Sequence, residues 1–224
     1  MTKYKDWTLE YDNDHQIYFF RSPRGGAKSS SVLGFGEYSC LQDFLDNFNM
    51  FFWIRRKESD ILAELPKLIP APIMEKYGIL NYKCKKGCIY ITFNGKDYEQ
   101  CGFYGAITTF KKGQRNFQNV KTIVFDEYND TCELVTNEKF KFWNAIATIV
   151  DKRADYKIVF LGNETIFYSP YEYLEKRPDM RLNTPALLST KSWNTLFCIK
   201  TLLFISIKIS KYAFYIFLCI IIYY

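Results

Sequence analysis

Residues 16–30 read QIYFFRSPRGGAKSS, and this stretch decides the fold class. Its first part, Gln16–Arg21, is a short aromatic run of the kind that forms a buried strand. Ser22–Ser29 follows at once, with a proline and two glycines, and leads into Ser29–Phe48, which is helix-like in its second half. A strand, a glycine-containing loop and a helix in direct succession indicate the beginning of an α/β domain.

The same alternation continues along the chain. Further strands are predicted at Phe51–Arg55, Thr122–Phe125 and Lys157–Leu161, with helices at Ser59–Leu68 and Asn137–Asp151. Asn94-Gly95 is a strong turn signal between the runs Cys88–Phe93 and Lys96–Phe103, which predicts a hairpin. We therefore expect a mainly parallel central sheet flanked by helices, with one inserted hairpin. Residues 59–104 are either a regular helix plus hairpin or an insertion.

Composition and charge narrow the class of protein. The chain has 224 residues, of which 48% are hydrophobic and 24% charged, so it is globular rather than disordered or collagen-like. The net charge is +6, but residues 180–224 hold five basic residues and no acidic one. Residues 1–179 hold 25 basic and 24 acidic residues, a net of +1. Overall charge is therefore no argument that the body of the chain binds nucleic acid.

The end of the chain differs from the rest. We expect one domain over residues 1–188 and a hydrophobic, acid-free tail over 189–224. The longest lysine-free apolar run, Tyr212–Tyr224, would span about 20 Å as a helix, against about 30 Å for a hydrocarbon core. Three interpretations stay open: an aberrant or truncated end, a buried or interfacial segment, and a membrane anchor, for which the run is short.

Seven cysteines and one histidine, His15, indicate a reducing compartment and bear on metal binding. Four of the cysteines, Cys84, Cys88, Cys101 and Cys132, are numerous enough for a zinc site. Their spacing matches no common zinc pattern, so free thiols are the preferred interpretation.

The loop after the first strand has the residues that a nucleoside triphosphate needs. Gly25 and Gly26 allow backbone N–H groups to converge on phosphates, Lys28 suits the β- and γ-phosphates, and the Ser29 hydroxyl suits Mg²⁺. The strict pattern G-x-x-x-x-G-K-[ST] is broken at Ser22 and at Ala27. The loop alone therefore fits a surface turn equally well.

Two later strands end in polar residues. Lys121–Glu127 is an apolar run that ends in Asp126 and Glu127, as in the strand of a P-loop NTPase whose Asp holds Mg²⁺ and whose Glu polarises the attacking water. Lys157–Asn163 ends in Asn163, which would meet the γ-phosphate or the water at the carboxyl edge of the sheet. The alternatives are two solvated carboxylates and a plain turn residue.

These blocks resemble the ATPase domain of phage large terminases, and most closely the DNA-encapsidation ATPase of small short-tailed phages. The resemblance extends from about Tyr18 to Leu174 and rests on several blocks in register. They are Arg24–Ser29, Trp53–Arg56, Tyr90–Lys96, Thr122–Glu127, and Leu161–Asn163 followed by Ser169-Pro170-Tyr171.

The resemblance implies an ATP-hydrolysing enzyme with ATP and Mg²⁺ as its cofactors. Residues Arg24, Gly25, Gly26, Ala27, Lys28 and Ser29 would bind the nucleotide, and Ser29 and Asp126 would hold the metal. Glu127 would be the catalytic carboxylate, with Arg24 and Asn163 assisting. Arg153 lies where relatives carry an arginine that reaches into a neighbouring subunit's site; its alternative is an exposed basic loop. Ala27 departs from the glycine that is usual in the family.

The resemblance also implies the setting of the reaction. Relatives form a homo-oligomeric ring on the portal, or connector, of a procapsid in the host cytoplasm and drive double-stranded DNA inward. A structural packaging RNA is a further candidate partner, and a membrane is not expected. No nuclease activity is expected either, because two-metal chemistry needs clustered carboxylates and no acid follows Asp179.

Basic loops are the candidates for DNA contact. Lys111, Lys112 and Arg115 lie in one loop, and Lys83, Lys85 and Lys86 cluster before it; solvated loops are the alternative. Two other functions stay open. One is a non-hydrolysing assembly protein that docks on the portal or on DNA, and the other is a membrane-anchored NTPase.

Overall fold

The computed structural model describes residues 5–12, 15–110, 116–129, 135–163 and 171, together with the backbone of 182–183 and 187–191. The chain divides into two units, Met1–Thr190 and Lys191–Tyr224, and the fold described below is that of the first unit. Except for its first three residues, the predicted tail of residues 189–224 lies outside the described residues, as does the predicted loop of Lys111, Lys112 and Arg115.

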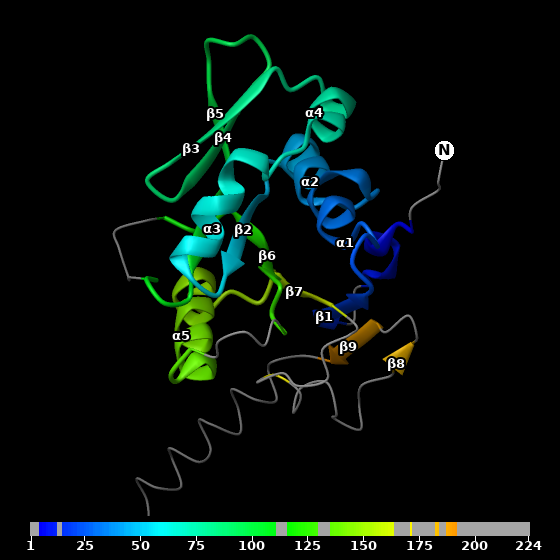
Figure 1. The fold of residues 1–224 in the computed structure, drawn as a ribbon, viewed down its shortest axis with the longest axis vertical. Helices are drawn as coiled ribbons and strands as arrows, with labels where there is room; N and C mark the ends of the chain where they lie inside the picture. Colours follow the sequence, from blue (N-terminus) through cyan, green and yellow to red (C-terminus); the bar gives the residue numbers. More distant parts are fainter. Residues whose placement is uncertain are drawn as a thin grey trace, which may run out of the picture. The chain divides into compact units, whose positions relative to one another are not determined.

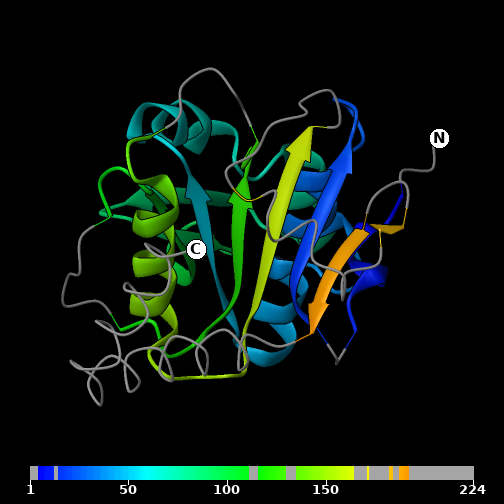
Figure 2. The same ribbon diagram turned by 90° about the horizontal axis from the view of Figure 1, so that it is seen from below.

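Five parallel strands form the centre of the sheet, in the order β5-β2-β6-β7-β1 (Figure 2). Their bounds are β1 His15–Ser22, β2 Met50–Arg55, β5 Glu99–Ala106, β6 Val120–Asp126 and β7 Lys157–Asn163. In the register, Phe160 of β7 lies opposite Phe19 of β1 on one side and Phe125 of β6 on the other. The predicted α/β class with a mainly parallel sheet is therefore confirmed, and β7 separates β1 from β6.

Antiparallel strands extend this centre at both ends of the order (Figure 1). On one side β3 (Asn81–Lys85) pairs with β4 (Cys88–Thr92), which pairs with β5. On the other side β8 (Leu182–Asn183) pairs with β9 (Leu187–Lys191). The predicted hairpin around Asn94-Gly95 is confirmed, but its second strand begins at Glu99 rather than at Lys96. The Asn94 side chain accepts hydrogen bonds from the backbone N–H groups of Lys96 and Asp97, both at 2.8 Å, which lengthens the turn.

The sequence did not reveal strand β3, and its turn to β4 explains how the strand forms. Lys86 and Gly87 have φ values of 53° and 77°, the left-handed pair that closes a two-residue hairpin. Residues 59–104 thus contain helices and a three-stranded antiparallel unit that continues the main sheet through β5.

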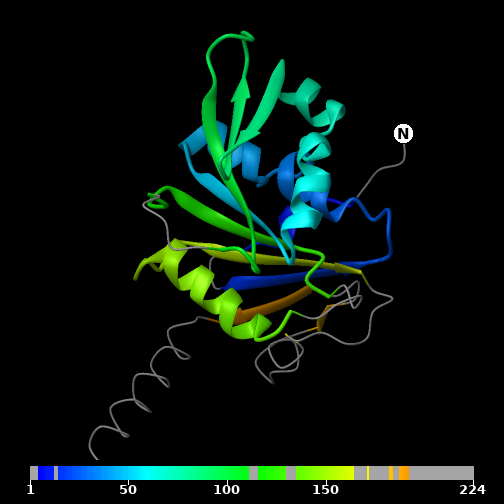
Figure 3. The same cartoon turned by 60° about the vertical axis from the view of Figure 1, so that its left-hand side comes forward.

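Short helices cover one face of the sheet and one longer helix covers the other (Figure 3). The first group, in colours from blue to blue-green, consists of α1 Lys28–Ser30, α2 Cys40–Asn47, α3 Glu58–Glu64 and α4 Ala71–Tyr77, with a π-helical turn at Ser31–Phe35 and 3₁₀ turns at Trp7–Glu10 and Leu65–Lys67. The helix on the opposite face is α5, Glu138–Val150. Helix α4 is not among the elements that the sequence predicts.

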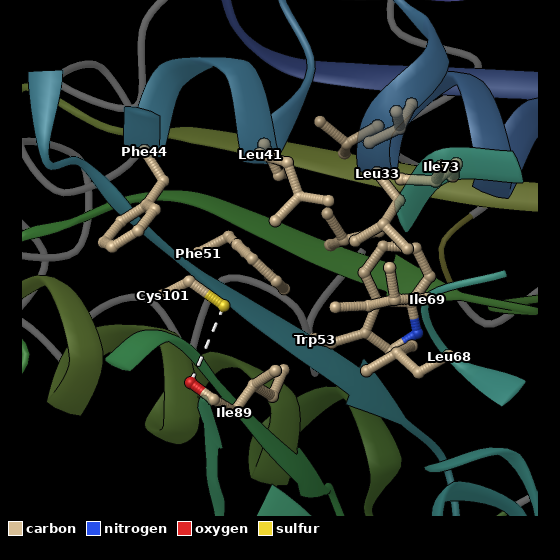
Figure 4. Packing of buried hydrophobic residues seen from close by; sticks show 14 of the residues in the cluster. Leu33, Leu41, Phe44, Phe51, Trp53, Leu68, Ile69, Ile73, Ile89 and Cys101 are labelled. Carbon is tan, nitrogen blue, oxygen red and sulfur yellow. Dashed lines mark hydrogen bonds between the residues drawn. The ribbon is translucent and has the colours of Figure 1, made fainter. Parts of the chain in front are cut away.

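The core lies where the short helices meet β1, β2, β6 and β7 (Figure 4). Leu33, Leu41 and Phe44 of the helical side pack against Phe51 and Trp53 of β2, and all five are less than 5% exposed. Burying one such side chain contributes about 1.5–3 kcal/mol to the free energy that favours folding. This packing holds the helical segment after β1 against the sheet.

Aromatic rings fill the other face, under α5. Phe19 and Phe160 stack with ring centroids 4.4 Å apart, and Phe125 stacks on Phe142 of α5 at 5.1 Å. The buried ring of Tyr171 meets Phe125 edge-on at 5.6 Å. Successive side chains of each central strand thus point to opposite faces of the sheet and are buried on both, as in a strand that is covered on its two sides. Among the described residues, no helix is long and apolar enough to cross a membrane.

Candidate functional site

The carboxyl ends of β1, β2, β6 and β7 open into a cleft of about 970 Å³. Its walls are the loop between β1 and α1, the ends of the other three strands and the α3–α4 segment. Nine of the site residues predicted from the sequence line it, namely Arg24, Gly25, Gly26, Ala27, Lys28, Ser29, Asp126, Glu127 and Asn163. The structure therefore brings together residues that lie up to 139 positions apart in the chain.

The backbone of the loop bends tightly after Ser22. A Cβ atom on Gly26 would lie 2.2 Å from Ser22 Oγ, so only glycine fits there without movement. Ala27 adopts φ 52° and ψ 24°, the left-handed conformation that costs a residue with a side chain about 1–2 kcal/mol. A glycine at this position would relieve that strain.

Lys28 folds back over the loop from the first helical position. Its Nζ donates hydrogen bonds to Ser22 O at 2.9 Å, to Ser22 Oγ at 2.8 Å and to Pro23 O at 3.4 Å. The side chain is buried although it carries a charge. The ammonium group is thus held at the concave side of the loop, beside the cleft that it lines.

Ser29, in the helix that follows β1, meets Asp126 at the end of β6, although β7 lies between β1 and β6. The Ser29 hydroxyl donates to Asp126 Oδ1 at 3.1 Å. Burial raises the pKa of Asp126 above its ordinary value, and Arg55 only partly offsets this effect. A hydroxyl beside a carboxylate is a pair of hard oxygen ligands of the kind that Mg²⁺ prefers.

Arg55, the last residue of β2, connects the two acids to helix α3. Its Nη2 lies 3.0 Å from Asp126 Oδ2 and also pairs with Glu64 Oε1, and its Nη1 lies 2.5 Å from Glu127 Oε2. Burial disfavours the charge of Arg55, but Asp126, Glu127 and Glu64 together raise its pKa. Burial raises the pKa of Glu64, while Arg55 acts in the opposite direction.

Arg55 was not among the site residues predicted from the sequence. Trp53–Arg56 is recognisable there only as a strand that ends in paired arginines. A basic residue at the carboxyl end of a buried strand, beside a second strand that ends in acids, is the signal that would have found the ion pair.

Arg56 points into a different ion pair and supports the fold. Its Nε lies 2.8 Å from Glu138 Oε2 at the start of α5, and its Nη2 donates to Tyr128 O at 2.6 Å. Arg56 and Glu138 are both buried. The paired arginines thus divide their roles, since only Arg55 lines the cleft.

The segment after the two acids holds Asn163 in place. The Asn129 side chain accepts a hydrogen bond from Asn163 N at 2.9 Å and donates one to Asn163 O at 2.7 Å. A Cβ atom on Gly162 would lie 2.4 Å from Tyr128 Cε1. The end of β7 is therefore locked to residues 128–129, and the Asn163 side chain is positioned at the cleft.

An N-terminal turn that the sequence analysis did not identify also supports the loop. The Trp7 indole Nε1 donates to Gly26 O at 3.0 Å, and Trp7 N donates to Ser31 Oγ at 3.0 Å. Ser31 Oγ in turn donates to Asp6 Oδ1 at 3.2 Å. The 3₁₀ turn at Trp7–Glu10 thus fixes both ends of the loop and helix that follow β1.

The two candidate arginines occupy different places. Arg24 is exposed and lies at the cleft. Arg153 does not line the cleft but lies near the amino ends of β6 and β7. Its guanidinium donates to five backbone carbonyls, those of Phe117, Gln118, Val120, Ile149 and Val150, at 2.7–3.0 Å.

These five bonds occupy every N–H group of the Arg153 side chain. The side chain therefore ties the end of α5 to the segment before β6. To reach a neighbouring subunit it would have to break all five bonds. The Arg153 side chain is partly buried, whereas the alternative interpretation was an exposed basic loop.

The cysteines of the described residues form no metal site. Cys40, Cys84, Cys88 and Cys101 are free thiols, and no group of three or more metal-ligating side chains occurs in the described part of the chain. Burial raises the pKa of Cys84 to about 11. Cys132, the fourth member of the suggested zinc set, lies outside the described residues.

Comparison with known proteins identifies the fold. No protein-family model and no curated protein sequence matches the chain. Solved structures match it with the architecture of phage DNA-packaging ATPases. One is the N-terminal domain of the DNA packaging ATPase from bacteriophage phi29, with a TM-score of 0.60 and 19% identity over 82% of this chain and 97% of that domain.

Two packaging motors match as well. The Phi-28 gp11 DNA packaging motor has a TM-score of 0.54 and 19% identity over 83% of this chain, and the phi29 genome packaging motor assembly has 0.59 and 20% over 80%. This chain spans 58% and 54% of those two chains. The resemblance that the sequence predicts is confirmed in the fold.

Proposed function

We propose that this protein is a Mg²⁺-dependent ATPase of the P-loop class that drives double-stranded DNA into a viral procapsid. The observation that carries the proposal is the meeting of Ser29 and Asp126 at 3.1 Å beside the buried Lys28. The fold shared with packaging ATPases supports it.

The chemistry of the residues fits the nucleotide and its metal. The Gly26 position has no room for a side chain, which leaves the loop backbone close to any phosphate that it surrounds. Lys28 would exchange its carbonyl partners for phosphate oxygens. The Ser29 hydroxyl and the Asp126 carboxylate would hold Mg²⁺, which supplies charge neutralisation at the phosphates.

Glu127 and Asn163 would act on the attacking water. The Glu127 carboxylate would orient the water and accept its proton, and the Asn163 amide would hydrogen-bond the water or the γ-phosphate. Glu127 can do so only after its carboxylate leaves Arg55. Arg24, exposed at the cleft, would add positive charge beside the phosphates. Arg153 is left out of this proposal because all its donors are engaged.

The partners follow from the same proposal. We expect a homo-oligomeric ring on the portal of a procapsid in the host cytoplasm, with double-stranded DNA as the cargo and a structural packaging RNA as an optional partner. Two of the solved structures that share this fold are DNA packaging motors, which supports this setting.

A non-hydrolysing assembly protein is the second candidate. It is favoured by the strained Ala27 in the phosphate loop and by the ion pair that holds Glu127. Such a protein would keep the fold and the docking surface but not complete a catalytic cycle.

One set of measurements tests both candidates. ATP hydrolysis and ATP binding are measured on the full chain with and without Mg²⁺, for wild type, Lys28→Ala, Glu127→Gln and the control Glu75→Gln, whose carboxyl is exposed on α4. Mg²⁺-dependent turnover that is lost in the first two variants and kept in the control supports the ATPase. Binding of ATP without turnover supports the assembly protein. If Lys28→Ala keeps both ATP binding and hydrolysis, both candidate functions are overturned.

A further inference from the structure

The N-terminal 3₁₀ turn, Trp7–Glu10, contacts the loop between β1 and α1 without lining the cleft. Trp7 is 2% exposed, and its ring lies 5.5 Å from that of Phe20 on β1. Its indole Nε1 donates a hydrogen bond to Gly26 O at 3.0 Å. Because an indole N–H can only donate, this bond fixes the direction in which the Gly26 carbonyl points.

The turn itself is anchored to the chain that follows the loop and its helix. The Asp6 carboxylate accepts hydrogen bonds from Thr8 N at 2.9 Å and from Glu37 N at 2.8 Å. The Thr8 hydroxyl accepts one from Tyr38 N at 3.0 Å. A Cβ atom on Gly36 would lie 2.4 Å from Thr8 Oγ1, so the two segments are in close contact. These contacts hold Trp7 in one place beside the loop.

The bond from Trp7 also determines where the next amide points. The Gly26 carbonyl and the Ala27 N–H belong to one planar, trans peptide unit, in which the two groups point in opposite directions. The carbonyl points to Trp7, so the Ala27 N–H points away from it. Among the described residues, this N–H has no hydrogen-bond acceptor. Since Ala27 lines the cleft and Trp7 does not, the N–H is available to a ligand in the cleft.

The backbone of the loop alternates in the way that forms an anion-binding nest. Gly25 and Ala27 have φ values of 86° and 52°, whereas φ is not positive at Gly26 between them or at Lys28 after them. Successive residues of opposite hand turn their N–H groups toward one side, where these groups can surround an anion. The Ala27 N–H is one of these groups, and its peptide plane is the one that Trp7 holds.

We propose that Trp7 is a positioning residue for the nucleotide, and that through the Gly26 carbonyl it directs the Ala27 N–H at the phosphate chain. This inference rests on the proposed function for its choice of a phosphate chain as the ligand. An N–H group that contacts the same phosphates before and during hydrolysis contributes to binding and not to the chemical step. Loss of the Trp7 bond therefore acts on KM rather than on kcat.

Two measurements on the full chain test the proposal. Steady-state hydrolysis gives KM and kcat for ATP, and calorimetry gives the Kd of inorganic tripolyphosphate, which has no base or sugar. The test variant is Trp7→Phe, which keeps an aromatic ring beside Phe20 and removes the donor. The control is Phe20→Leu, which removes the ring partner of Trp7 and keeps the indole N–H. Thermal unfolding shows that each variant is folded at the temperature of the measurements.

Trp7→Phe is expected to raise the KM for ATP and the Kd for tripolyphosphate alike, by about three- to tenfold, the usual contribution of one hydrogen bond. Its kcat is expected to stay within about twofold of wild type. Phe20→Leu is expected to lower the melting temperature and to leave both constants unchanged. Equal constants for wild type and Trp7→Phe overturn the proposal. A rise of the same size in Phe20→Leu also overturns it, because packing and not the donor would then be the cause.

Thr8→Val is the second test variant. It keeps the shape of the side chain but loses the hydroxyl that bonds to Asp6 and Tyr38, so the turn is anchored less firmly. Both constants are expected to rise in the same direction as in Trp7→Phe, by a smaller factor. If Trp7→Phe does not fold, unchanged constants in Thr8→Val overturn the proposal.

The outcomes also separate this inference from the proposed function. If wild type binds tripolyphosphate more tightly than Trp7→Phe does but hydrolyses no ATP, the proposed ATPase fails and the role of Trp7 stands. If wild type hydrolyses ATP with the same KM as Trp7→Phe, the role of Trp7 fails and the ATPase stands. Wild type that binds neither ATP nor tripolyphosphate overturns both.

Discussion

The guanidinium of Arg55 lies within 3.0 Å of both candidate acids, Asp126 and Glu127, at the end of β2. A buried arginine thus neutralises the two carboxylates to which the proposed function gives the metal and the water. Arg55 also pairs with Glu64 on α3, so one cation links the helix that lines the cleft to the two acids at the end of β6. Any ligand that binds Asp126 must compete with Arg55 for that carboxylate.

Removal of Arg55 is expected to destabilise the protein strongly. Arg55→Met leaves Asp126 buried without its counter-charge, and loss of one partner of a buried pair costs about 3–5 kcal/mol. Urea unfolding measures the free energy of unfolding. Arg24→Met is the control, because Arg24 is exposed, and it is expected to change this free energy by less than about 0.5 kcal/mol. Arg55→Met/Asp126→Leu is expected to recover part of the loss, and a single variant as stable as wild type would contradict the ion pair.

Stability is expected to depend on pH through Asp126. Burial raises the pKa of Asp126, so between the ordinary and the raised pKa the folded protein binds more protons than the unfolded chain. The free energy of unfolding of wild type, relative to Asp126→Asn, is therefore expected to rise as pH falls through that window, by at most about 1.4 kcal/mol per pH unit. Unfolding curves at several pH values between 7 and 4 measure the difference.

Asp155 provides a control of opposite sign. A hydrogen bond from Lys121 lowers the pKa of Asp155, so its contribution is lost as pH falls through the lowered pKa. Relative to Asp155→Asn, wild type is expected to lose stability as the pH falls. If the difference in unfolding free energy between wild type and variant changed with pH in the same way for Asp126→Asn and for Asp155→Asn, neither carboxyl would be responsible.

Glycine at position 27 is expected to stabilise the protein. Ala27 has φ 52°, and removing its side chain relieves a strain of about 1–2 kcal/mol. This gain exceeds the free-energy cost of restricting glycine, which has more conformational freedom in the unfolded chain. Ala27→Gly is expected to raise the free energy of unfolding by about 0.5–1 kcal/mol. Ala63→Gly in the helix α3 is the matched control and is expected to lower it by about 1 kcal/mol. A loss of stability in both variants would contradict the strained loop.

Arg153 is expected to matter for stability. Arg153→Lys replaces five donors in a fixed fork by three and leaves carbonyls without partners, at a cost of about 2–3 kcal/mol. Thermal and urea unfolding measure the loss, with Lys152→Gln as the exposed neighbouring control. An arginine that serves only a neighbouring subunit would instead leave unfolding unchanged and abolish hydrolysis.

The central strands could be predicted because each is a short apolar run between turn residues, buried on both faces. The positions of Ser29 and Asp126 at one edge followed from the parallel order of their strands. Strand β3 was not predicted, because two lysines and an exposed face hide its alternation. The start of helix α4 is concealed by Pro70, which comes just before the helix, and by Pro72, its second residue.

The roles of the arginines could not be read from the chain in the same way. Arg55 pairs with acids 71 and 72 positions away, and Arg153 bonds to backbone carbonyls that have no sequence signal. The Trp7 contact to Gly26 joins two segments through a main-chain oxygen and is equally invisible. Such contacts depend on how two loops approach each other, which residue type alone does not specify.

The Trp7 indole is also a built-in optical probe. It is 2% exposed and bonded to a carbonyl of the loop that would surround phosphates. A rearrangement of Gly26 alters the electric field at the ring that absorbs and emits light. Events at the loop can therefore be followed by intrinsic fluorescence in the unlabelled chain, with Trp7→Phe as the blank.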